Sequence, residues 1–593
     1  MSVAATPELQ ALQASLLDWS KRTDSIATVR ALELGQASPD LSVLEIVGPD
    51  EVTAADAPVQ TAAAACEQLA ASLVPGPVMP TLLAALLGVR ASIAAVGFDN
   101  SKKLTVVRQP GGTLRVTGQT GPILCDDAAA MLVLGAEDVW FRIDPAQPGV
   151  TITPLRALDF SRGLASVRLE NATAEAIDGL TTGHVRDMAV TLFAAEAAGI
   201  AAWCSATAAA YAKARRQFGK LIGEFQAVRH LCAWMHCRAE RAGALAWDAA
   251  RAADEEPGRH PRAASEAAAK VLDDAVENAK DCIQVLGGIG FTWEHDAHLY
   301  LRRALALRAL LSPQVPPPAM GAEGEPGGMP SPQTQGVPGG RPPESHRPPE
   351  SSGDLGIGTW AIPAIKRHGT EEQQARFIGP TMNREIVWCQ LFSEPEAGSD
   401  LAGLRTRAIR TEGGWRLTGQ KVWTSLAHQA DWAICLARTD PDVPKREGLS
   451  YFAVDMHADG IEIRPLREIT GRSLFNEVFL DDVFVPDDCL IGAPGDGWKV
   501  AMSTLAVERE TIGGGDVLAE RGVHPAVRKL LGVEARQAEA EQALTALGPA
   551  GAVESPEAEE FLLTRCLSIA GGTTQILLNQ VAERVLGLPK DPR

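Results

Sequence analysis

The spacing of apolar residues along this chain follows two different periods. "VTITPLRAL" and "IEIRPLREI" alternate apolar and polar residues, and each is followed by a second alternating stretch, "ASVRLENA" or "NEVFLDDVFVP". Period-two alternation punctuated by Gly and Asp predicts short antiparallel strands, so each half should contain a small β domain. Ala-rich stretches of helical period predict three long helices at residues 185–214, 224–253 and 263–286, the last ending at Gly287-Gly288.

The two halves are similar to each other. "GGTLRVTGQTGPILCDDAAAMLVL" (111–134) aligns with "GGWRLTGQKVWTSLAHQADWAICL" (413–436). Residues 312–352 are dominated by Pro, Gly and Ser, and such a segment cannot offset its ordering entropy, so we expect a disordered or extended linker there. The second half is the shorter one, with room for only one or two helices between this linker and its β domain.

Length, charge and cysteine usage narrow the class of protein. A chain of 593 residues needs several cores, and its net charge of −19 argues against binding nucleic acid. No signal peptide and no membrane-spanning run is expected. The ten cysteines are scattered, which is typical of reduced thiols in a cytoplasmic protein, and no His/Cys/Asp cluster has the spacing of a metal site.

One stretch occurs only in the second half. "WCQLFSEPEAGSD" (388–400) begins as a strand that Pro395 ends, and its Ala-Gly-Ser-Asp turn offers backbone N–H groups and a hydroxyl to a phosphate or polyol. In "GQKVWTS" a Trp beside two hydroxyl residues can stack on a flat aromatic ligand. A strand that simply ends in a polar turn is the alternative for either stretch alone.

These stretches resemble motifs of the acyl-CoA dehydrogenase family. The second half also carries "FNEVFLDDVFVP", "GDGWKVAM" and "AGGTTQILLNQVAERVLGLP", and the first half carries "ARRQFGKLIGEFQAVRH" and "QVLGGIGFTWEHDAHLYLRRA". The resemblance implies an α+β, mostly α fold with a helical N-domain, a β-barrel-like middle domain and a C-terminal bundle. It also implies FAD as cofactor and oxidation of an acyl-CoA thioester to the trans-2-enoyl-CoA.

The fold is expected in two tandem, partly degenerate copies. The expected segments are a helical N-domain (1–95), a middle β domain (96–175) and a helical bundle (176–311); the linker (312–352); and a remnant N-domain (353–385), a second middle β domain (386–492) and a shortened bundle (493–593).

The resemblance also assigns cofactor residues, divided between the halves. In the second half Trp423 would stack on the flavin, Ser425 would reach its N5, and the other assigned residues are Gln390, Phe392, Ser393, Ser399, Thr573 and Gln575. In the first half Pro122 and Leu124 replace Trp423 and Ser425, so its ring site is expected to be lost. That half keeps the residues for the diphosphate and adenine, namely Arg215, Phe218, Gln226, Gln284, Gly287 and Gly288. Surface or capping roles are the alternative for Arg215 and Gln284.

The α-proton of the substrate requires a carboxylate base. Many family members place a Glu in a C-terminal "YEGT" motif, but here the stretch is "AGGT" with Gly571, whose N–H could instead bind the thioester carbonyl. Others place it in "LxxER", which assigns Glu508. Glu508 continues an apolar helical stripe from Trp498, Ala501 and Leu505, so burial should raise its pKa and suit it to base catalysis.

Other roles remain open for the titratable residues. Glu508 could be a buried structural glutamate, and Glu196 is a rival base, although Ala189 falls at the family's base position in that half. His295 and His298 are expected on a solvated helix or turn.

The substrate and electron acceptor follow only from the resemblance. The "GFTWEHDAHLYLRRA" stretch is similar to actinobacterial steroid side-chain enzymes, so a steroid-CoA is the expected substrate, and an electron-transfer flavoprotein is the expected acceptor. An oxidase using O2 and a truncated, non-catalytic family member are the alternatives. The two copies should form an intrachain pseudo-dimer, with further dimerisation left open.

Overall fold

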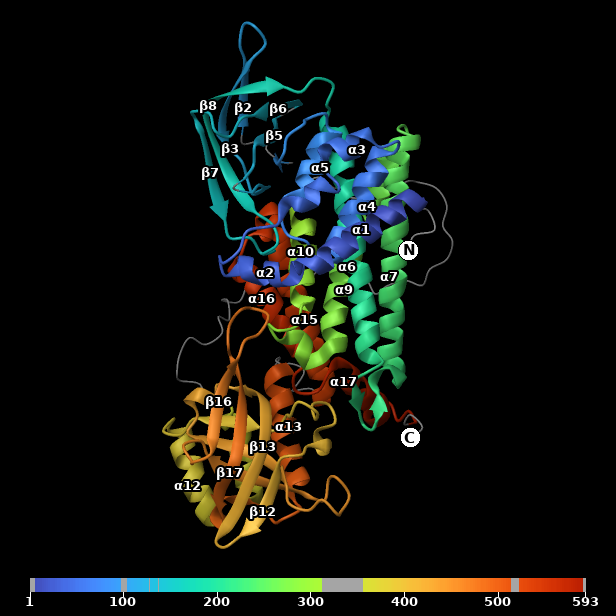
Figure 1. Ribbon diagram of the computed structural model, residues 1–593. Helices are drawn as coiled ribbons and strands as arrows, with labels where there is room; N and C mark the ends of the chain where they lie inside the picture. Colours follow the sequence, from blue (N-terminus) through green and yellow to red (C-terminus); the bar gives the residue numbers. More distant parts are fainter. Residues whose placement is uncertain are drawn as a thin grey trace.

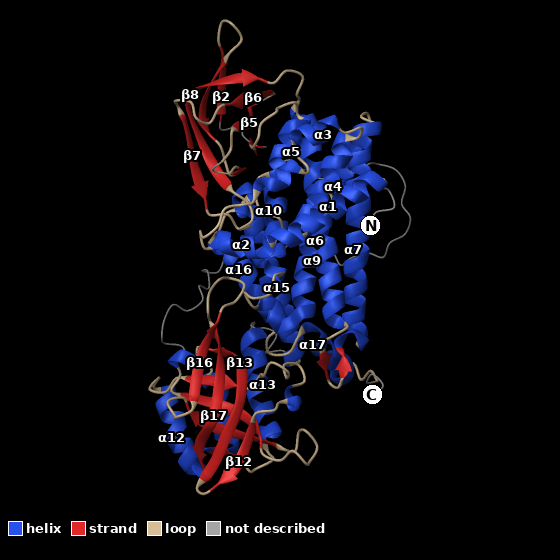
Figure 2. Cartoon of the chain, in the orientation of Figure 1, coloured by secondary structure: helices blue, strands red, loops and turns tan. Residues whose placement is uncertain are grey.

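Two β domains lie at opposite ends of a helical bundle (Figures 1 and 2). The computed structural model describes residues 6–97, 104–126, 128–136, 138–311, 356–513 and 522–589, with side chains left out for 510–513. The expected linker, 312–352, lies outside the described residues.

Five helices form the N-terminal layer of the first half. They are α1 (Pro7–Thr23), α2 (Ser25–Glu33), α3 (Pro49–Ala54), α4 (Pro58–Ala71) and α5 (Val78–Leu86). α4 carries an almost continuous run of buried small residues, which allows it to approach the central helix closely. Gly199 of that helix marks the contact, because a Cβ there would lie 2.1 Å from the carbonyl oxygen of Glu67.

The bundle of the first half is built around one central helix. Its members are α6 (Thr182–Ala212), α7 (Gln226–Glu255), α8 (His260–Ala268), α9 (Val271–Leu286) and α10 (Ala297–Leu311). α6 is long and apolar enough to cross a membrane, but 89% of its most apolar window is buried inside the protein, where α4, α7 and α9 pack around it. Its hydrophobicity is that of a core helix.

Two expectations for this bundle need correction. The helix predicted at 263–286 is two helices, because Lys270, with φ −133°, leaves the helical region between α8 and α9. His298 is not solvated but fully buried on α10, with its ring against Trp293 at a centroid distance of 4.5 Å. The acidic residues next to it in the sequence are less buried: Glu294 is exposed and Asp296 is half-buried.

The first β domain is an eight-stranded sheet with the order β2-β3-β8-β4-β1-β5-β6, with β7 paired to β8. Its strands are β1 (Ala94–Gly97), β2 (Leu104–Arg108), β3 (Leu114–Gln119), β4 (Ile123–Leu124), β5 (Met131–Ala136), β6 (Val139–Ile143), β7 (Val150–Leu155) and β8 (Leu164–Ala176). A two-stranded ribbon, β9 (Arg216–Gln217) and β10 (Lys220–Leu221), joins α6 to α7.

The second β domain has the order β16-β17-β13-β12-β14-β15-β18, with β11 paired to β14. Its strands are β11 (Trp388–Leu391), β12 (Arg407–Thr411), β13 (Gly414–Ser425), β14 (Trp432–Arg438), β15 (Leu449–Asp455), β16 (Ile461–Leu466), β17 (Phe475–Pro486) and β18 (Leu490–Ile491).

The two sheets share much of their pairing. The parallel pair β1–β5 corresponds to the parallel pair β11–β14, and the antiparallel ladders of β8 with β3 and β7 correspond to those of β17 with β13 and β16. Both long ladders shift register at the same point, before Gly118 in one and Gly419 in the other. A shared irregularity of this kind is more specific than shared strand order, because bulges are local features.

The remaining helices belong to the second half. They are α11 (Gly358–His368), α12 (Glu371–Met382), α13 (Gly497–Gly513), α15 (Pro525–Ala546), α16 (Pro556–Leu563) and α17 (Thr574–Gln580). The one or two helices expected between the linker and the second β domain are present as α11 and α12. α11, α12 and α13 pack on the second β domain, whereas α15 and α16 lie along the bundle of the first half (Figure 1).

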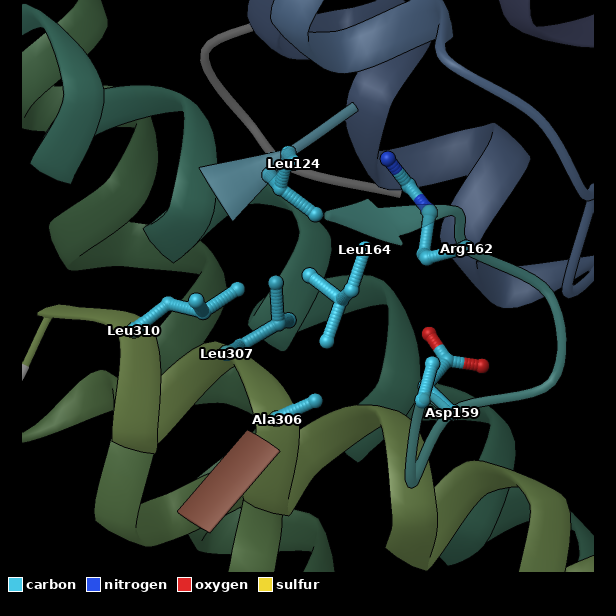
Figure 3. Close-up of a pocket in the computed structure, with 8 residues that line it drawn as sticks. Leu124, Asp159, Arg162, Leu164, Ala306, Leu307 and Leu310 are labelled. Atoms are coloured by element: carbon cyan, nitrogen blue, oxygen red, sulfur yellow. The ribbon is translucent and has the colours of Figure 1, made fainter. Parts of the chain in front are cut away.

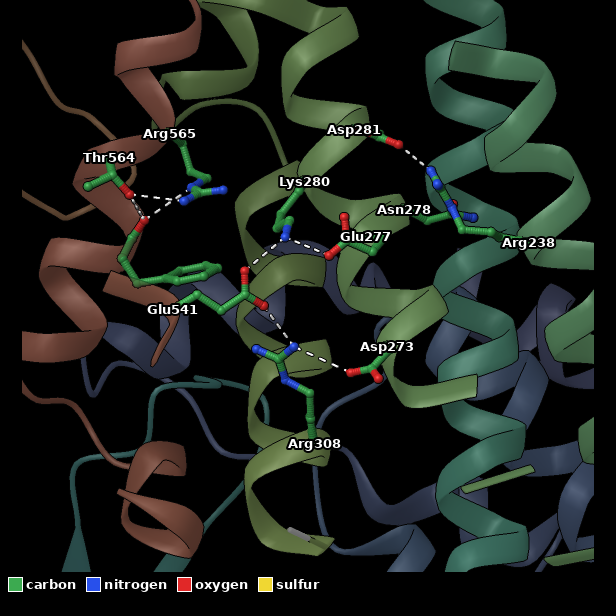
Figure 4. A network of polar contacts seen from close by, with 11 residues as sticks. Arg238, Asp273, Glu277, Asn278, Lys280, Asp281, Arg308, Glu541, Thr564 and Arg565 are labelled. Atoms are coloured by element: carbon green, nitrogen blue, oxygen red, sulfur yellow. Dashed lines mark hydrogen bonds and ion pairs between the residues drawn. The ribbon is translucent and has the colours of Figure 1, made fainter. Parts of the chain in front are cut away.

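A network of charges holds α15 to that bundle (Figure 4). Glu541 of α15 accepts hydrogen bonds from Lys280 of α9 at 3.0 Å and from Arg308 of α10 at 2.9 Å. All three side chains are largely shielded from water, which makes such pairs stronger than surface ion pairs. α15 is thereby fixed to the bundle of the first half.

Candidate active site

The turn after β11 is anchored by a buried ion pair. Glu394 accepts hydrogen bonds from Lys421 Nζ at 2.8 Å and from the backbone N–H groups of Arg405 and Thr406 at 2.6 and 2.9 Å. Lys421, which is fully buried, also donates to the carbonyl of Phe392 at 3.1 Å. Because every charge has partners, the burial cost is offset and the Ser-Glu-Pro turn is fixed against β13.

Trp423 projects from an irregular point of β13. Its φ is +61°, and the ladder with β17 shifts register between Lys421 and Thr424. Its ring lies 5.4 Å from the ring of Phe475 and 6.1 Å from that of Phe291 in the first half. A half-buried indole from the second β domain therefore packs on the core of the first half's bundle.

The element that meets Trp423 is η3 (Gly287–Phe291), which follows α9. A Cβ on Gly288 would lie 2.7 Å from the indole Nε1 of Trp423, so only glycine fits without a shift. Gly287 has φ +65°, a backbone conformation that glycine adopts without strain. Gly288 of the first half and Trp423 of the second are thus in direct contact.

A second contact between the halves involves the polar turn itself. Arg215 Nη2 donates to the carbonyl of Pro395 at 2.7 Å, and its guanidinium lies 3.5 Å from the carboxylate of Glu396. Gln217 donates to the carbonyl of Glu396 at 2.8 Å and accepts from the N–H of Asp400 at 2.9 Å. Gln217 was missed by the sequence analysis, although it lies inside the "ARRQFG" stretch that contains Arg215.

The third contact joins two glutamines. Gln284 Nε2 donates to Gln575 Oε1 at 3.1 Å and to the carbonyl of Ser568 at 3.1 Å, while Ser568 Oγ donates to Gln284 Oε1 at 2.6 Å. Thr573, next to this site, caps α17 by accepting from the N–H of Ile576 at 3.3 Å. Gln284 and Gln575 therefore belong to one polar cluster, and Thr573 has a local structural task there.

The other expected cofactor residues differ in exposure. Phe392 is buried, and the carbonyl of Ser393 accepts from the N–H of Val422 at 3.0 Å. Ser425 is half-buried and pairs across the sheet with Phe475. The residues exposed to solvent are Phe218, Gln226 and Ser399. Phe392 therefore belongs to the core of the second β domain, and Phe218, Gln226 and Ser399 are open to water.

Glu508 lies on α13 beside the end of β11. Only 6% of it is exposed, and its Oε2 accepts from Gln390 Nε2 at 3.4 Å. Burial raises the pKa of Glu508, while the hydrogen bond from Gln390 and the positive charges of Lys529 and Arg509 act in the opposite direction. Burial therefore increases the proton affinity of the Glu508 carboxylate, while its polar and positively charged neighbours favour the ionised form.

Gly571 lies in a loop that α15 holds in place. Lys529 Nζ donates to the carbonyl oxygens of Ala570 and Gly572, the latter at 3.0 Å. Lys529 is 1% exposed, and the sequence analysis missed it. A signal was available, because Ala526, Lys529 and Val533 form one buried helical stripe, and a lysine is unusual there.

Glu196, the rival base, is paired. It is 1% exposed, and its carboxylate bonds the guanidinium of Arg162 inside the first half. Arg162 lines a cavity of about 10 Å³, together with Leu124, Asp159, Leu164, Ala306 and Leu307 (Figure 3). The cross-strand pair Leu124–Leu164 stands where the second β domain has Ser425–Phe475. This place in the first half has room for roughly one water molecule.

Sequence comparisons identify the family. The family model described as "Acyl-CoA dehydrogenase, C-terminal domain" matches residues 188–310 and 516–586, and "Acyl-CoA dehydrogenase, middle domain" matches 389–483. Acyl-CoA dehydrogenase FadE34 of Mycobacterium tuberculosis is 40% identical over 722 aligned positions, covering 100% of this chain and 100% of the relative. The chain belongs to the acyl-CoA dehydrogenase family, and it is an acyl-CoA dehydrogenase by homology.

Two further similarities are partial. Acyl-CoA dehydrogenase IpdE1 of the same species is 37% identical over 287 residues, covering 39% of this chain and 74% of the relative. The solved glutaryl-CoA dehydrogenase from Mycobacterium smegmatis superposes with a TM-score of 0.44 at 19% identity, over 53% of this chain and 92% of that one. The family assignment rests on the sequence matches and not on this superposition.

Proposed function

We propose that this chain oxidises an acyl-CoA thioester to the trans-2-enoyl-CoA at one composite site that both halves build. The observation that supports it is the convergence of three contacts at their junction. Gly288 meets Trp423, Arg215 meets the turn at Pro395, and Gln284 meets Gln575. Each pair joins a residue assigned to the nucleotide end of FAD with the flavin-ring domain or the C-terminal motif of the other half.

In this proposal the halves are tandem copies of one fold. Support comes from the shared pairing of the two sheets and from the register shifts at Gly118 and Gly419. The proposed segments are those expected from the sequence, with 1–311 as the first copy and 353–593 as the second. The relative's alignment spans 722 positions against 593 residues here, so the relative contains segments without a counterpart in this chain.

FAD is implied by family membership, and the residues at the junction fit it. Gln390 Oε1 is buried and has no hydrogen-bond partner among the described residues, so a ligand could supply one. Arg215 offers a guanidinium beside a backbone turn, which suits a diphosphate. The half-buried indole of Trp423 offers an aromatic surface to a planar ring.

When bound, FAD would supply the hydride acceptor. The chain's residues would handle the rest of the oxidation. Glu508 would remove the α-proton, because a buried carboxylate of raised pKa is a stronger base than one in water. The N–H of Gly571 would donate to the thioester carbonyl and stabilise the negative charge that develops there. Gln390, which bonds Glu508, would orient the carboxylate.

The finer assignments rest on motif resemblance alone. A steroid side-chain CoA is the proposed substrate because of the "GFTWEHDAHLYLRRA" stretch, and an electron-transfer flavoprotein is the proposed acceptor in the cytoplasm. Transfer to O2 is the alternative, and anaerobic turnover with a dye against peroxide release separates the two. A non-catalytic role is the third reading, because the second copy is short.

The test is flavin content followed by turnover. The purified chain should be yellow with about one FAD per chain, since only one of the two β domains keeps the ring residues. Glu508→Gln should keep the flavin and lose turnover by at least about a thousandfold. Glu510→Gln, two residues further along α13, is the matched control. A colourless protein, or an active Glu508→Gln variant, would contradict the proposal.

A further inference from the structure

Lys529 is the buried cation between the two elements that carry the proposed chemistry. It stands on α15, which packs against α13, the helix of Glu508, and it bonds the loop that contains Gly571. We infer that Lys529 is a positioning residue that aims the N–H of Gly571 and keeps the carboxylate of Glu508 ionised. This inference rests on the proposed function and deepens it.

The direction of the Gly571 N–H follows from the geometry of the peptide unit. The carbonyl of Ala570 and the N–H of Gly571 belong to one peptide unit, and the described residues contain no cis peptide bonds. In a trans peptide these two groups point in opposite directions. Because the carbonyl of Ala570 accepts from Lys529 Nζ, the N–H of Gly571 is turned away from α15.

A second bond from the same ammonium fixes the other side of the loop. The carbonyl of Gly572 accepts from Lys529 Nζ at 3.0 Å, which by the same geometry sets the N–H of Thr573. Gly571 and Gly572 have φ of +59° and +98°, so the loop adopts a backbone that other residues rarely take. A flexible Gly-Gly pair thereby acquires one orientation.

The charge of Lys529 acts on the base as well. Burial lowers the pKa of Lys529 to about 8, the charge of Glu508 raises it, and that of Arg509 lowers it. Among the described residues, the thiol of Cys566 also faces Lys529, and Arg584 faces Arg509. Lys529 is therefore a cation held beside a buried acid, and each favours the charged form of the other.

This arrangement predicts two limbs in the pH profile of kcat/KM. Protonation of Glu508 would produce the acid limb. Loss of the proton from Lys529 near pH 8 would produce the basic limb, because the neighbouring carboxylate would lose its cation and the loop its charged donor. If Lys529 only packed against α13, the acid limb of Glu508 would remain and the basic limb near pH 8 would be absent.

The test compares three variants of the full chain with a dye acceptor between pH 5.5 and 10. Lys529→Met should remove the basic limb, move the acid limb up by about 1–3 pH units and lower kcat at least tenfold at pH 7, with FAD retained. Lys529→Arg keeps a charge that does not titrate, so it should remove the basic limb and leave the acid limb in place. Lys499→Met, an exposed lysine of α13, is the control.

The outcomes separate this inference from the proposed function. If both Lys529 variants keep a limb near pH 8, or if Lys529→Met leaves the acid limb where it was, the inference is wrong. Should Lys529→Met fail to fold, the basic limb of Lys529→Arg alone decides. An active Glu508→Gln variant would instead overturn the base assignment, whatever the Lys529 variants do.

Discussion

Gln284 and Gln575 lie 291 positions apart in the sequence, and their side chains share a hydrogen bond of 3.1 Å. One stands near the end of α9 in the first half and the other in the first turn of α17 near the chain's end. Ser568 reinforces the pair by bonding Gln284 through both its carbonyl and its hydroxyl. In the function we propose, the nucleotide end of the cofactor site would therefore be assembled from both halves.

Removing the guanidinium of Arg215 should weaken FAD binding. Arg215→Met loses a charge-assisted contact of about 1.5–3 kcal/mol, which is roughly a ten- to hundredfold rise in Kd for FAD. Flavin fluorescence during titration of the apoprotein measures it. Arg216→Met, at an exposed neighbour, should bind FAD like the parent chain. Equal affinities in the two variants would count against a cofactor site shared by the halves.

Adding one methyl group at Gly288 should disturb the junction. The backbone of Gly288 is not left-handed, so Gly288→Ala tests only the contact with Trp423, whose Nε1 would lie 2.7 Å from the new Cβ. We expect a loss of about 1–3 kcal/mol in stability together with weaker flavin binding. Thermal unfolding followed by flavin and tryptophan fluorescence measures both.

Gly379→Ala is the matched control for that substitution. Gly379 lies in α12, and a Cβ there meets nothing within 4 Å. It should be neutral or stabilising by about 0.5–1 kcal/mol, because alanine favours the helix. If Gly288→Ala behaves like Gly379→Ala, the indole does not depend on a glycine at that position.

Breaking the pair Lys421–Glu394 should release the turn after β11. Lys421→Met leaves the carboxylate of Glu394 buried without its cation, a loss of about 3–5 kcal/mol. The double variant Lys421→Met/Glu394→Gln should recover part of it, because no charge then remains buried. Denaturant unfolding of the single and double variants measures the coupling. A single variant as stable as the parent would show that the pair contributes nothing.

Glu508→Gln should stabilise the fold at neutral pH while removing activity. Burial raises the pKa of Glu508 in the folded chain above its ordinary value of 4.5. The proton that the folded state holds more tightly stabilises it fully below the unfolded pKa, and this contribution is lost as pH rises through the folded pKa.

The thermal midpoint is the measurement for that prediction. At pH 7 the buried charge is unfavourable in the parent chain and absent in the variant, so the midpoint should rise by about 1–4 °C. At pH 4, below the ordinary pKa of 4.5, Glu508 is mostly protonated in both states and the difference should become small. A constant difference at both pH values would mean that the carboxyl is not titrating between them.

Much of this architecture could be predicted from the spacing of apolar residues, because strands and helices repeat it with different periods. The alternating stretch at 475–486 became β17, and the apolar stripe of α13 placed Glu508 on its buried face. The pattern does not show which element packs against the apolar face of each helix or strand. His298 lies among acidic residues in sequence, yet its ring is buried against that of Trp293.

Lys529 shows the same limit at the candidate site. Its stripe is visible in the sequence, but the carbonyl oxygens that satisfy it belong to residues 570 and 572, more than forty positions away. Gly571 was assigned from a motif in which the family's glutamate is absent, and nothing local indicates what would hold that loop. The contact depends on the packing of α15 against α13, which brings Lys529 to the loop.

The Leu124–Leu164 pair has an evolutionary meaning in the arrangement we propose. A symmetric pair of identical subunits would contain two equivalent sites, so each substitution would alter both of them. Here one of the two places is filled with aliphatic side chains, and the halves are free to diverge separately. The first β domain then needs to preserve only its sheet and its packing, whereas the second must preserve a ligand's shape.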